Sequence, residues 1–339
     1  MKLRNIGISL ASVLTATAAA SAITAASASA ADLKLAIVYD GSKFDRSFSQ
    51  SASDGVERFK KETKVPVLEA QVNSTTQSEQ VLRSLARKNV DMIAVISFAQ
   101  AQAVQTVAAE FPKVKFVLID GIATGPNVKS VLFKEEEGSY LAGVAAALAT
   151  KSKKIGFIGG MDIPMIRAFG CGYAQGAKAV DAKVELTQNM VGNTSAAWND
   201  PARGGELARS QFDRGVDVVF GAAGGTGLGI LQTAKEKNKL AIGVNSNQNY
   251  LYPGTMLTSM LKRVDNAVYT SFTELKNGHF QAGTTSMGLK EGGVDWALDK
   301  DNRTLVSDAA EKRINAAKQD IISGKIKVVD YRAGNSCPV

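Results

Sequence analysis

The sequence predicts an α/β fold built from two parallel-sheet units in succession. Short apolar runs alternate regularly with stretches of helical spacing, as in the segment 47–62, where Phe48, Val56 and Phe59 share one face. The alternation runs β-α-β-α-β-α-β to Asp120 and then starts again. Such alternation is typical of parallel sheets with right-handed crossovers. Because no long linker separates the units, we expect two lobes joined by short crossovers.

Each expected element rests on a local pattern. In the first unit, buried apolar strands alternate with amphipathic helices at residues 33–39, 47–62, 65–70, 78–88, 92–97, 101–110 and 115–119, and a strand at 128–133 carries the chain across. In the second unit, the elements are expected at 136–149, 154–158, 164–180, 184–190, 201–214, 216–220, 225–237, 240–244, 255–260, 265–277 and 309–323. Pro201 suits the first helical position, where a missing N–H costs little.

Most predicted strands end in a polar or small residue. These ends are Asp40, Ser97, Asp120, Gly159, Gly221 and Asn245. Because the carboxyl ends of parallel strands share one edge, where open α/β folds bind ligands, both lobes should point such residues into one cleft.

Residues 1–30 have the pattern of a signal peptide that is cleaved. Lys2 and Arg4 precede a run of apolar and small residues, and Ala28-Ser29-Ala30 matches a small-x-small cleavage site. The alternative is a membrane anchor, but the run is too weakly apolar for a stable span. No cysteine lies near the cleavage site, so the sequence does not indicate lipid attachment. We therefore expect a soluble protein exported to the periplasm.

Charge and composition argue against several classes of function. The formal charge of +8 falls to +6 without the signal peptide, and the nearest basic cluster, Lys151, Lys153 and Lys154, is typical of a solvated helix end rather than a nucleic-acid site. His279 is the single histidine. No pattern of metal ligands or catalytic triad accompanies it, so neither a metal nor a cofactor is expected.

The two cysteines, Cys171 and Cys337, are expected to form a disulfide. Their even number permits a bridge in an oxidising compartment, and Cys337 lies in a Gly-Asn-Ser tail with no core to bury it. The alternative is two unpaired thiols.

The loop after the first strand offers candidate ligand contacts. Asp40, Phe48 and Gln50 could face a ligand, with Phe48 stacking on it. The alternative is an ordinary helix start, with Asp45 or Ser47 as the cap and Phe48 packed into the lobe.

A second candidate site joins Trp198-Asn199-Asp200-Pro201 to the small-residue turn 222–227. That turn connects a strand to a helix, but it has neither the P-loop nor the GxGxxG spacing, so it suits a neutral ligand as well as a phosphate. Trp198 and Asn199 supply an aromatic face and an amide, and Gly225 allows close backbone approach. Trp198 is equally compatible with the core. Further along, Asn245 could bind sugar hydroxyls, whereas Lys262 is compatible with either the site or the surface.

Together these segments resemble the basic membrane protein, or purine nucleoside receptor, family of ABC-transporter substrate-binding proteins. The resemblance rests on the segments 45–50, 198–201, 222–227, 242–248 and 259–265, in order over the mature chain. It implies a periplasmic-binding-protein type I fold, with two Rossmann-like lobes, a hinge and a cleft between the lobes. The N-terminal lobe would comprise 31–131 plus about 258–288, and the C-terminal lobe about 132–257 plus 289–339.

The resemblance also implies roles for individual residues. Phe48 and Trp198 would stack on the two faces of a purine, with Trp198 standing where the family usually has Phe. Asp40 and Asp120 would bond the ligand from the first lobe, Gly225 through its backbone, and Lys262 at the ribose. Asn245 departs from the family's usual Asp, which predicts that Lys262 lacks its counter-charge.

The predicted function is therefore a non-catalytic, monomeric binding protein. It would capture a purine nucleoside by hinge closure and deliver it to an ABC permease in the inner membrane, with no nucleic acid as partner. A receptor for a pentose or purine base on the same fold is the alternative among binding proteins. An exported nucleoside hydrolase, using Asp40, Asp45, Asp120 or Asp200, is the alternative among enzymes.

Overall fold

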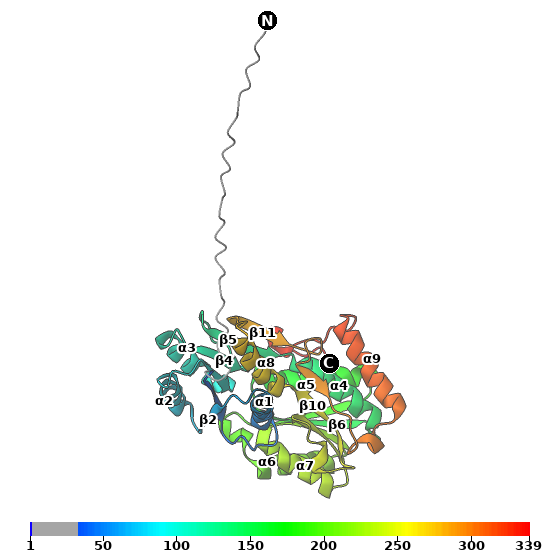
Figure 1. Ribbon diagram of the computed structural model, residues 1–339. Helices are drawn as coiled ribbons and strands as arrows, with labels where there is room; N and C mark the ends of the chain where they lie inside the picture. The colour runs from blue at the N-terminus through cyan, green and yellow to red at the C-terminus, as the bar shows by residue number, and fades with distance from the viewer. Residues whose placement is uncertain (2–32) are drawn as a thin grey trace.

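Two six-stranded sheets organise the chain (Figure 1). A computed structural model describes residues 33–339 together with Met1, and the predicted signal peptide lies outside the described residues. The strand orders are β11-β5-β4-β3-β1-β2 and β12-β10-β9-β8-β6-β7. All pairings are parallel except that of β10 with β12. The predicted α/β class with two parallel-sheet lobes is confirmed.

The first lobe, defined here by the first sheet and its helices, contains β1 Leu35–Asp40, α1 Phe48–Thr63, β2 Val67–Val72, α2 Thr75–Ala86, β3 Met92–Ile96, α3 Ala101–Glu110, β4 Lys115–Ile119, β5 Val128–Phe133, α8 Val264–Lys276 and β11 Gly283–Met287. The second lobe contains α4 Glu135–Ala149, β6 Lys154–Met161, α5 Pro164–Val180, β7 Glu185–Gly192, α6 Pro201–Asp213, β8 Val218–Ala222, α7 Gly227–Glu236, β9 Leu240–Asn245, β10 Met256–Lys262, β12 Val294–Trp296 and α9 Asp308–Ile322.

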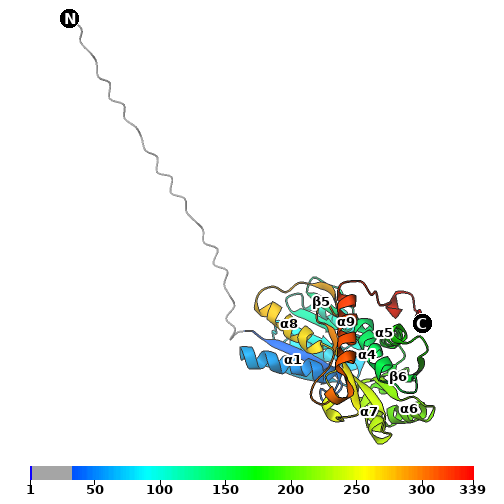
Figure 2. The same cartoon turned by 90° about the vertical axis from the view of Figure 1, so that its right-hand side faces the viewer.

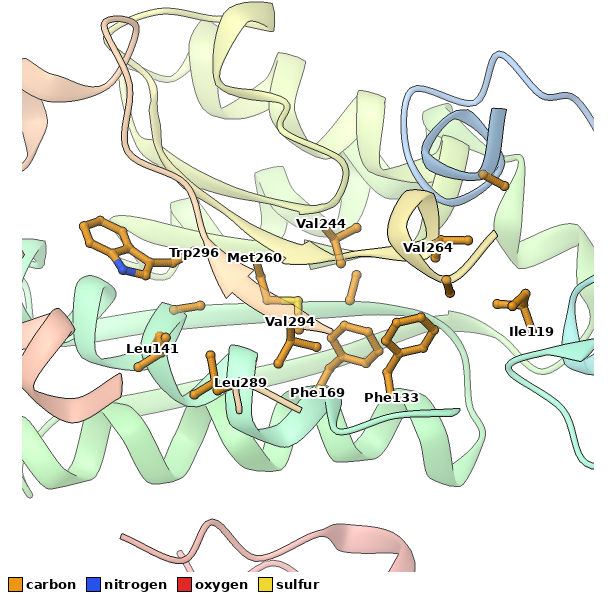
Figure 3. Packing of buried hydrophobic residues seen from close by; sticks show 14 of the residues in the cluster. Ile119, Phe133, Leu141, Phe169, Val244, Met260, Val264, Leu289, Val294 and Trp296 are labelled. Atoms are coloured by element: carbon orange, nitrogen blue, oxygen red, sulfur yellow. The ribbon is translucent and has the colours of Figure 1, made fainter. Parts of the chain in front are cut away.

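Helices cover both faces of each sheet. In the first lobe α1 and α8 lie side by side, and in the second lobe α4 packs along α5 and α6 along α7 (Figures 1 and 2). One hydrophobic cluster runs through both lobes, since it includes Ile119 of β4 as well as Val244 of β9 (Figure 3). Burial of this shared apolar surface stabilises the connection between the lobes.

The strand order reverses once in each sheet. In the first lobe β1 lies between β2 and β3, and in the second β6 lies between β7 and β8. Ligands of open α/β sheets bind outside the carboxyl ends of strands at such reversals. This rule directs attention to the residues that follow β1, β3, β6 and β8.

Three crossovers connect the lobes, after β5, after β10 and after β11, and backbone hydrogen bonds hold them together. The amide of Lys134 donates to Met287 at 3.1 Å, and the amide of Arg263 donates to Gly293 at 2.8 Å. The first crossover follows β5, which runs to Phe133 in the first sheet, and the second follows β10, which pairs with β9 in the second sheet. Residues up to Phe133 thus lie in the first sheet and residues Met256–Lys262 lie in the second, whereas the expected boundaries are 131 and about 258.

The sequence analysis did not predict two short strands, β11 and β12. Strand β11 has the sequence GTTSM and is largely exposed at an edge, and β12 spans only three residues. Neither has a long apolar or alternating pattern, so nothing local distinguishes them from loops. No helix within residues 33–339 is long and apolar enough to cross a membrane.

Candidate functional site

A buried lysine lies where the two lobes meet. The side chain of Lys262, the last residue of β10, is only 2% exposed. Its Nζ lies 2.5 Å from Oδ2 of Asp120, which follows β4 in the first lobe, and 2.9 Å from Oε1 of Glu135, the first residue of α4. Lys262 is therefore buried where the lobes meet and is not a surface lysine.

Three aromatic rings surround this ammonium group. The Nζ of Lys262 lies 5.4 Å from the ring centroid of Phe48, 5.0 Å from that of Phe133 and 5.7 Å from that of Phe169. Phe133 and Phe169 lie side by side (Figure 3). Ring faces attract a cation, and they also exclude water from the ion pairs, which strengthens their electrostatic interaction. Phe48, at the first position of α1, is only partly buried.

The charges of this group depend on one another. Burial and the neighbouring Glu135 raise the pKa of Asp120 to about 6, against the opposing effect of Lys262. Burial alone would lower the pKa of Lys262, but Asp120 and Glu135 outweigh it and raise that pKa. The lysine is therefore a cation held between the carboxyl groups of Asp120 and Glu135.

The prediction that Lys262 lacks a counter-charge is wrong. It assumed that only residue 245 could supply one, whereas Asp120 and Glu135 both do so from other elements. Glu135 was missed by the sequence analysis. Its signal was the acidic run Glu135-Glu136-Glu137 at a helix start, a pattern that ordinarily indicates a favourable helix-dipole interaction.

Asn245 instead joins the two lobes. Its Nδ2 donates to Oγ of Ser47 at 2.8 Å. Beside it, the hydroxyl of Ser246 donates to the carbonyl of Ser47 at 2.6 Å, and Nε2 of Gln248 donates to the carbonyl of Arg46 at 2.8 Å. These three bonds, which we call the interlobe strap, tie the loop before α1 to the end of β9.

Unusual backbone conformations gather at the same edge. Four residues without the freedom of glycine have positive φ here: Arg46 at 57°, Ser97 at 144°, Asp120 at 67° and Asn245 at 66°. Such conformations cost about 1–3 kcal/mol each and cluster at functional sites. Three of them directly follow or end strands β3, β4 and β9, where the strand-end pattern predicted the cleft.

The loop between β1 and α1 combines a structural and a candidate ligand role. Asp45 caps the helix, because its carboxylate accepts from the amides of Ser47, Ser49 and Gln50 at 2.8–3.0 Å. Asp40 is exposed at the end of β1. The side-chain Nε2 of Gln50 donates to Oδ1 of Asp54 on its own helix at 2.9 Å, so this side chain is not part of the lysine cluster.

Trp198 ends a 3₁₀ turn, Ser195–Trp198, and is half-buried. Its indole lies directly over Gly160 of β6, where an added Cβ would stand 2.3 Å from Cζ3. The hydroxyl of Thr226 fixes the turn, because it donates to the carbonyl of Ala197 at 2.8 Å and accepts from the amide of Asp200 at 2.7 Å. Thr226, unremarkable in the sequence, is fully buried.

The structure also brings the rest of this segment together. A Cβ at Gly225 would lie 3.3 Å from the carbonyl of Trp198 and 3.4 Å from Oδ1 of Asn199. Asn199 is exposed, whereas Gly225 is buried. The predicted neighbourhood of Trp198, Asn199 and the small-residue turn is thus present at the carboxyl edge of the second sheet.

A cavity of about 350 Å³ lies against the ion pairs. Its walls come from both lobes, since Phe98 and Asp120 belong to the first and Glu135 and Met165 to the second. Arg332, from the C-terminal tail, also lines it. The lobes therefore leave a partly open hollow beside Asp120.

The predicted disulfide between Cys171 and Cys337 is confirmed, with a Cα–Cα distance of 5.6 Å. It attaches the C-terminal tail to α5. The side chain of Gln175, one turn further along α5, exchanges two hydrogen bonds of 2.9 Å with the backbone of Val329. The tail is consequently held at two points.

The two lobes, the strand-order reversals and the polar groups at the interlobe edge define a solute-binding protein. Solved structures agree. An ABC-transporter solute-binding protein from Aeropyrum pernix K1 superposes with a TM-score of 0.80 at 30% identity, covering 88% of this chain and 93% of its own. A solute-binding protein from Conexibacter woesei has a TM-score of 0.73 at 23% identity, covering 88% and 99%.

The chain belongs to the Bmp family, described as ABC transporter substrate-binding protein PnrA-like, which it matches over residues 33–331. It is 37% identical to the ABC transporter nucleoside-binding protein BmpA of Lactococcus lactis over 322 residues, covering 88% of this chain and 89% of that one. It is 31% identical to basic membrane protein A of Borreliella burgdorferi, covering 87% of each. Members of this family are substrate-binding proteins and not enzymes, so the nucleoside hydrolase alternative is wrong.

Proposed function

We propose that this substrate-binding protein captures a purine nucleoside between its lobes. The observation that carries the proposal is the buried Lys262, paired with Asp120 and facing the partly exposed ring of Phe48. A charged group that can donate to hydroxyls, next to an aromatic face, matches the two chemical halves of a nucleoside. The relative from Lactococcus lactis, which is named a nucleoside-binding protein, supports the same ligand class.

The base would stack between aromatic side chains of the two lobes. Phe48 contributes from the first lobe and Trp198 from the second, and Gly225 and Asn199 would offer polar contacts to the base edge. Stacking on an aromatic ring is worth about 1–3 kcal/mol per base. Every purine base has a flat face, so stacking favours purine nucleosides as a class but does not select one purine base over another.

The sugar would bind at the lysine. Lys262 can donate to ribose hydroxyls, while Asp120 accepts from them. Oδ1 of Asp120 is buried and has no hydrogen-bond partner within the described chain, which is costly unless a ligand or water satisfies it. Asp40 ends β1 of the first lobe and Asn245 ends β9 of the second, so these side chains could complete the sugar contacts from both lobes.

Closure around the ligand would use the three crossovers as a hinge. Contacts to both lobes favour the closed state, since only that state offers them together. The closed protein, a monomer, would then dock on an ABC permease of the inner membrane and release the nucleoside for import. Cleavage after Ala30 would place the protein in the periplasm.

A thermal-shift panel on mature protein, refolded to remove bound ligand, tests this proposal. Inosine, guanosine and adenosine should each raise the melting temperature, because a ligand that binds only the folded state at 100 times its Kd adds about 2.7 kcal/mol. Ribose, hypoxanthine and cytidine serve as controls. A shift with ribose alone would favour the pentose alternative, and a shift with hypoxanthine equal to that with inosine would favour the purine base.

A further inference from the structure

Arg332 reaches the ligand site from the C-terminal tail. Its guanidinium lies 2.8 Å from Oε2 of Glu135 and 3.0 Å from Oε2 of Glu136, and it donates to the carbonyl of Phe133 at 3.2 Å. All three partners lie at the first crossover between the lobes. The arginine therefore contacts the hinge and the site at once.

Glu135 is shared between two cations. Its Oε1 faces Lys262 at 2.9 Å while its Oε2 faces Arg332 at 2.8 Å. Lys262 in turn contacts Asp120 at 2.5 Å. A continuous chain of ion pairs thus leads from the tail to the carboxylate that lines the interlobe cavity.

Arg332 is needed to balance the charges. The side chains of Asp120, Glu135 and Glu136 are 4%, 1% and 6% exposed, and a buried carboxylate without a partner is strongly destabilising. Without Arg332, Lys262 would be left as the partner of both Asp120 and Glu135. With Arg332 absent, Glu135 would draw Lys262 toward itself and away from Asp120.

The tail is fixed on both sides of Arg332. Val329, three residues before it, bonds to Gln175, and Cys337, five residues after it, is joined to Cys171. Both anchors lie on α5. Gly172, on the same helix, allows α5 to approach α4 closely, because a Cβ there would lie 2.3 Å from the carbonyl of Glu136.

We propose that Arg332, held by the disulfide-anchored tail, is a positioning residue of the ligand site. By occupying one oxygen of Glu135, it keeps Lys262 on Asp120, and so sets the arrangement that binds ligand. This inference rests on the proposed function for the choice of ligand. It makes the C-terminal tail part of the binding machinery although the tail lies outside both sheets.

Calorimetric titration with inosine, well below the melting temperature, tests the role of Arg332. Arg332→Met should weaken binding about tenfold, and Arg332→Lys should restore most of the loss. Glu135→Gln in the Arg332→Met background should also restore affinity, because it removes the carboxylate that would otherwise draw Lys262 away from Asp120. Arg313→Met, which removes an exposed arginine on α9, is the matched control and should bind as wild type. Replacing both cysteines by serine should give an intermediate loss.

The outcomes separate this inference from the proposed function. Wild-type affinity in Arg332→Met would overturn the positioning role, and so would a loss that neither Arg332→Lys nor the added Glu135→Gln relieves. Wild-type protein that binds no nucleoside would overturn the proposed function instead. In that case the melting temperatures of the unliganded proteins test the role of Arg332. Adding Glu135→Gln should recover the melting temperature lost in Arg332→Met, and strictly additive effects of the two substitutions would contradict the charge coupling.

Discussion

Asn245 and Ser47 link the two lobes through a hydrogen bond of 2.8 Å from Nδ2 to Oγ. Asn245 ends β9 of the second lobe, and Ser47 precedes α1 of the first. Ser47 is fully buried and its hydroxyl also donates to the carbonyl of Val244 at 3.3 Å. The bond thus joins the two lobes next to the strand end where a ligand would bind.

Asn245→Gly should weaken nucleoside binding by about 1 kcal/mol, the scale of one hydrogen bond, or roughly fivefold. Glycine removes the amide without straining the positive φ of this position. Asn245→Asp is the control and should stay near wild type, because the hydroxyl of Ser47 can donate to a carboxylate. Calorimetric titration measures the affinity of each protein for the nucleoside. Equal affinity for wild type, Asn245→Gly and Asn245→Asp would mean that the interlobe strap does not contribute to ligand binding.

Trp198→Ala should weaken nucleoside binding by about 1–3 kcal/mol through lost stacking. Since the indole is half-buried against Gly160, the unliganded protein should also lose some stability. Two further variants separate the effects. Trp198→Phe keeps an aromatic face and should bind nearly as well, and Gly160→Ala should weaken binding by displacing an intact indole. Full affinity in Gly160→Ala and Trp198→Ala would assign Trp198 to the core.

Glu136 should make stability depend on pH. Burial, together with Asp330, raises its pKa to about 8 although Arg332 opposes the shift. Between its ordinary value of 4.5 and about 8, the folded state holds a proton that the unfolded chain has released. The free energy of unfolding should therefore fall as pH rises through this window, by at most about 1.4 kcal/mol per pH unit. Denaturant titrations of Glu136→Gln should lack this part of the slope; an unchanged slope would mean that other groups cause it.

Reduction of the disulfide should lower the free energy of unfolding by about 2–5 kcal/mol, because Cys171 and Cys337 close a long loop, with a sequence separation of 166. Intact-mass analysis after alkylation, without reductant, should find no free thiol in exported protein. Two alkylated cysteines would contradict the bridge. The Cys337→Ser variant should reproduce the stability of the reduced protein.

The sequence was informative where local pattern determines structure. The spacing of apolar residues predicted nearly every helix and strand, because this spacing depends only on the residues of the segment itself. The edge strands β11 and β12 were missed because exposure and short length leave no such period. Trp198 could be picked out because a large aromatic in a polar turn is unusual.

The electrostatics of the site could not be predicted in the same way. Lys262, Asp120, Glu135 and Arg332 come from four separate segments, and only the crossovers bring them together. A sequence pattern does not reveal which carboxylate a lysine will meet across a lobe boundary. For that reason the expected loss of counter-charge at Lys262 was wrong, and the role of Arg332 became visible only in three dimensions.

A crystal structure of the mature protein with inosine would test the central proposal most directly. We expect density for one nucleoside between the rings of Phe48 and Trp198, with ribose hydroxyls in hydrogen-bond contact with Asp120 and Lys262. Density confined to another part of the surface, or a ligand touching only one lobe with Lys262 and Asp120 uncontacted, would contradict it.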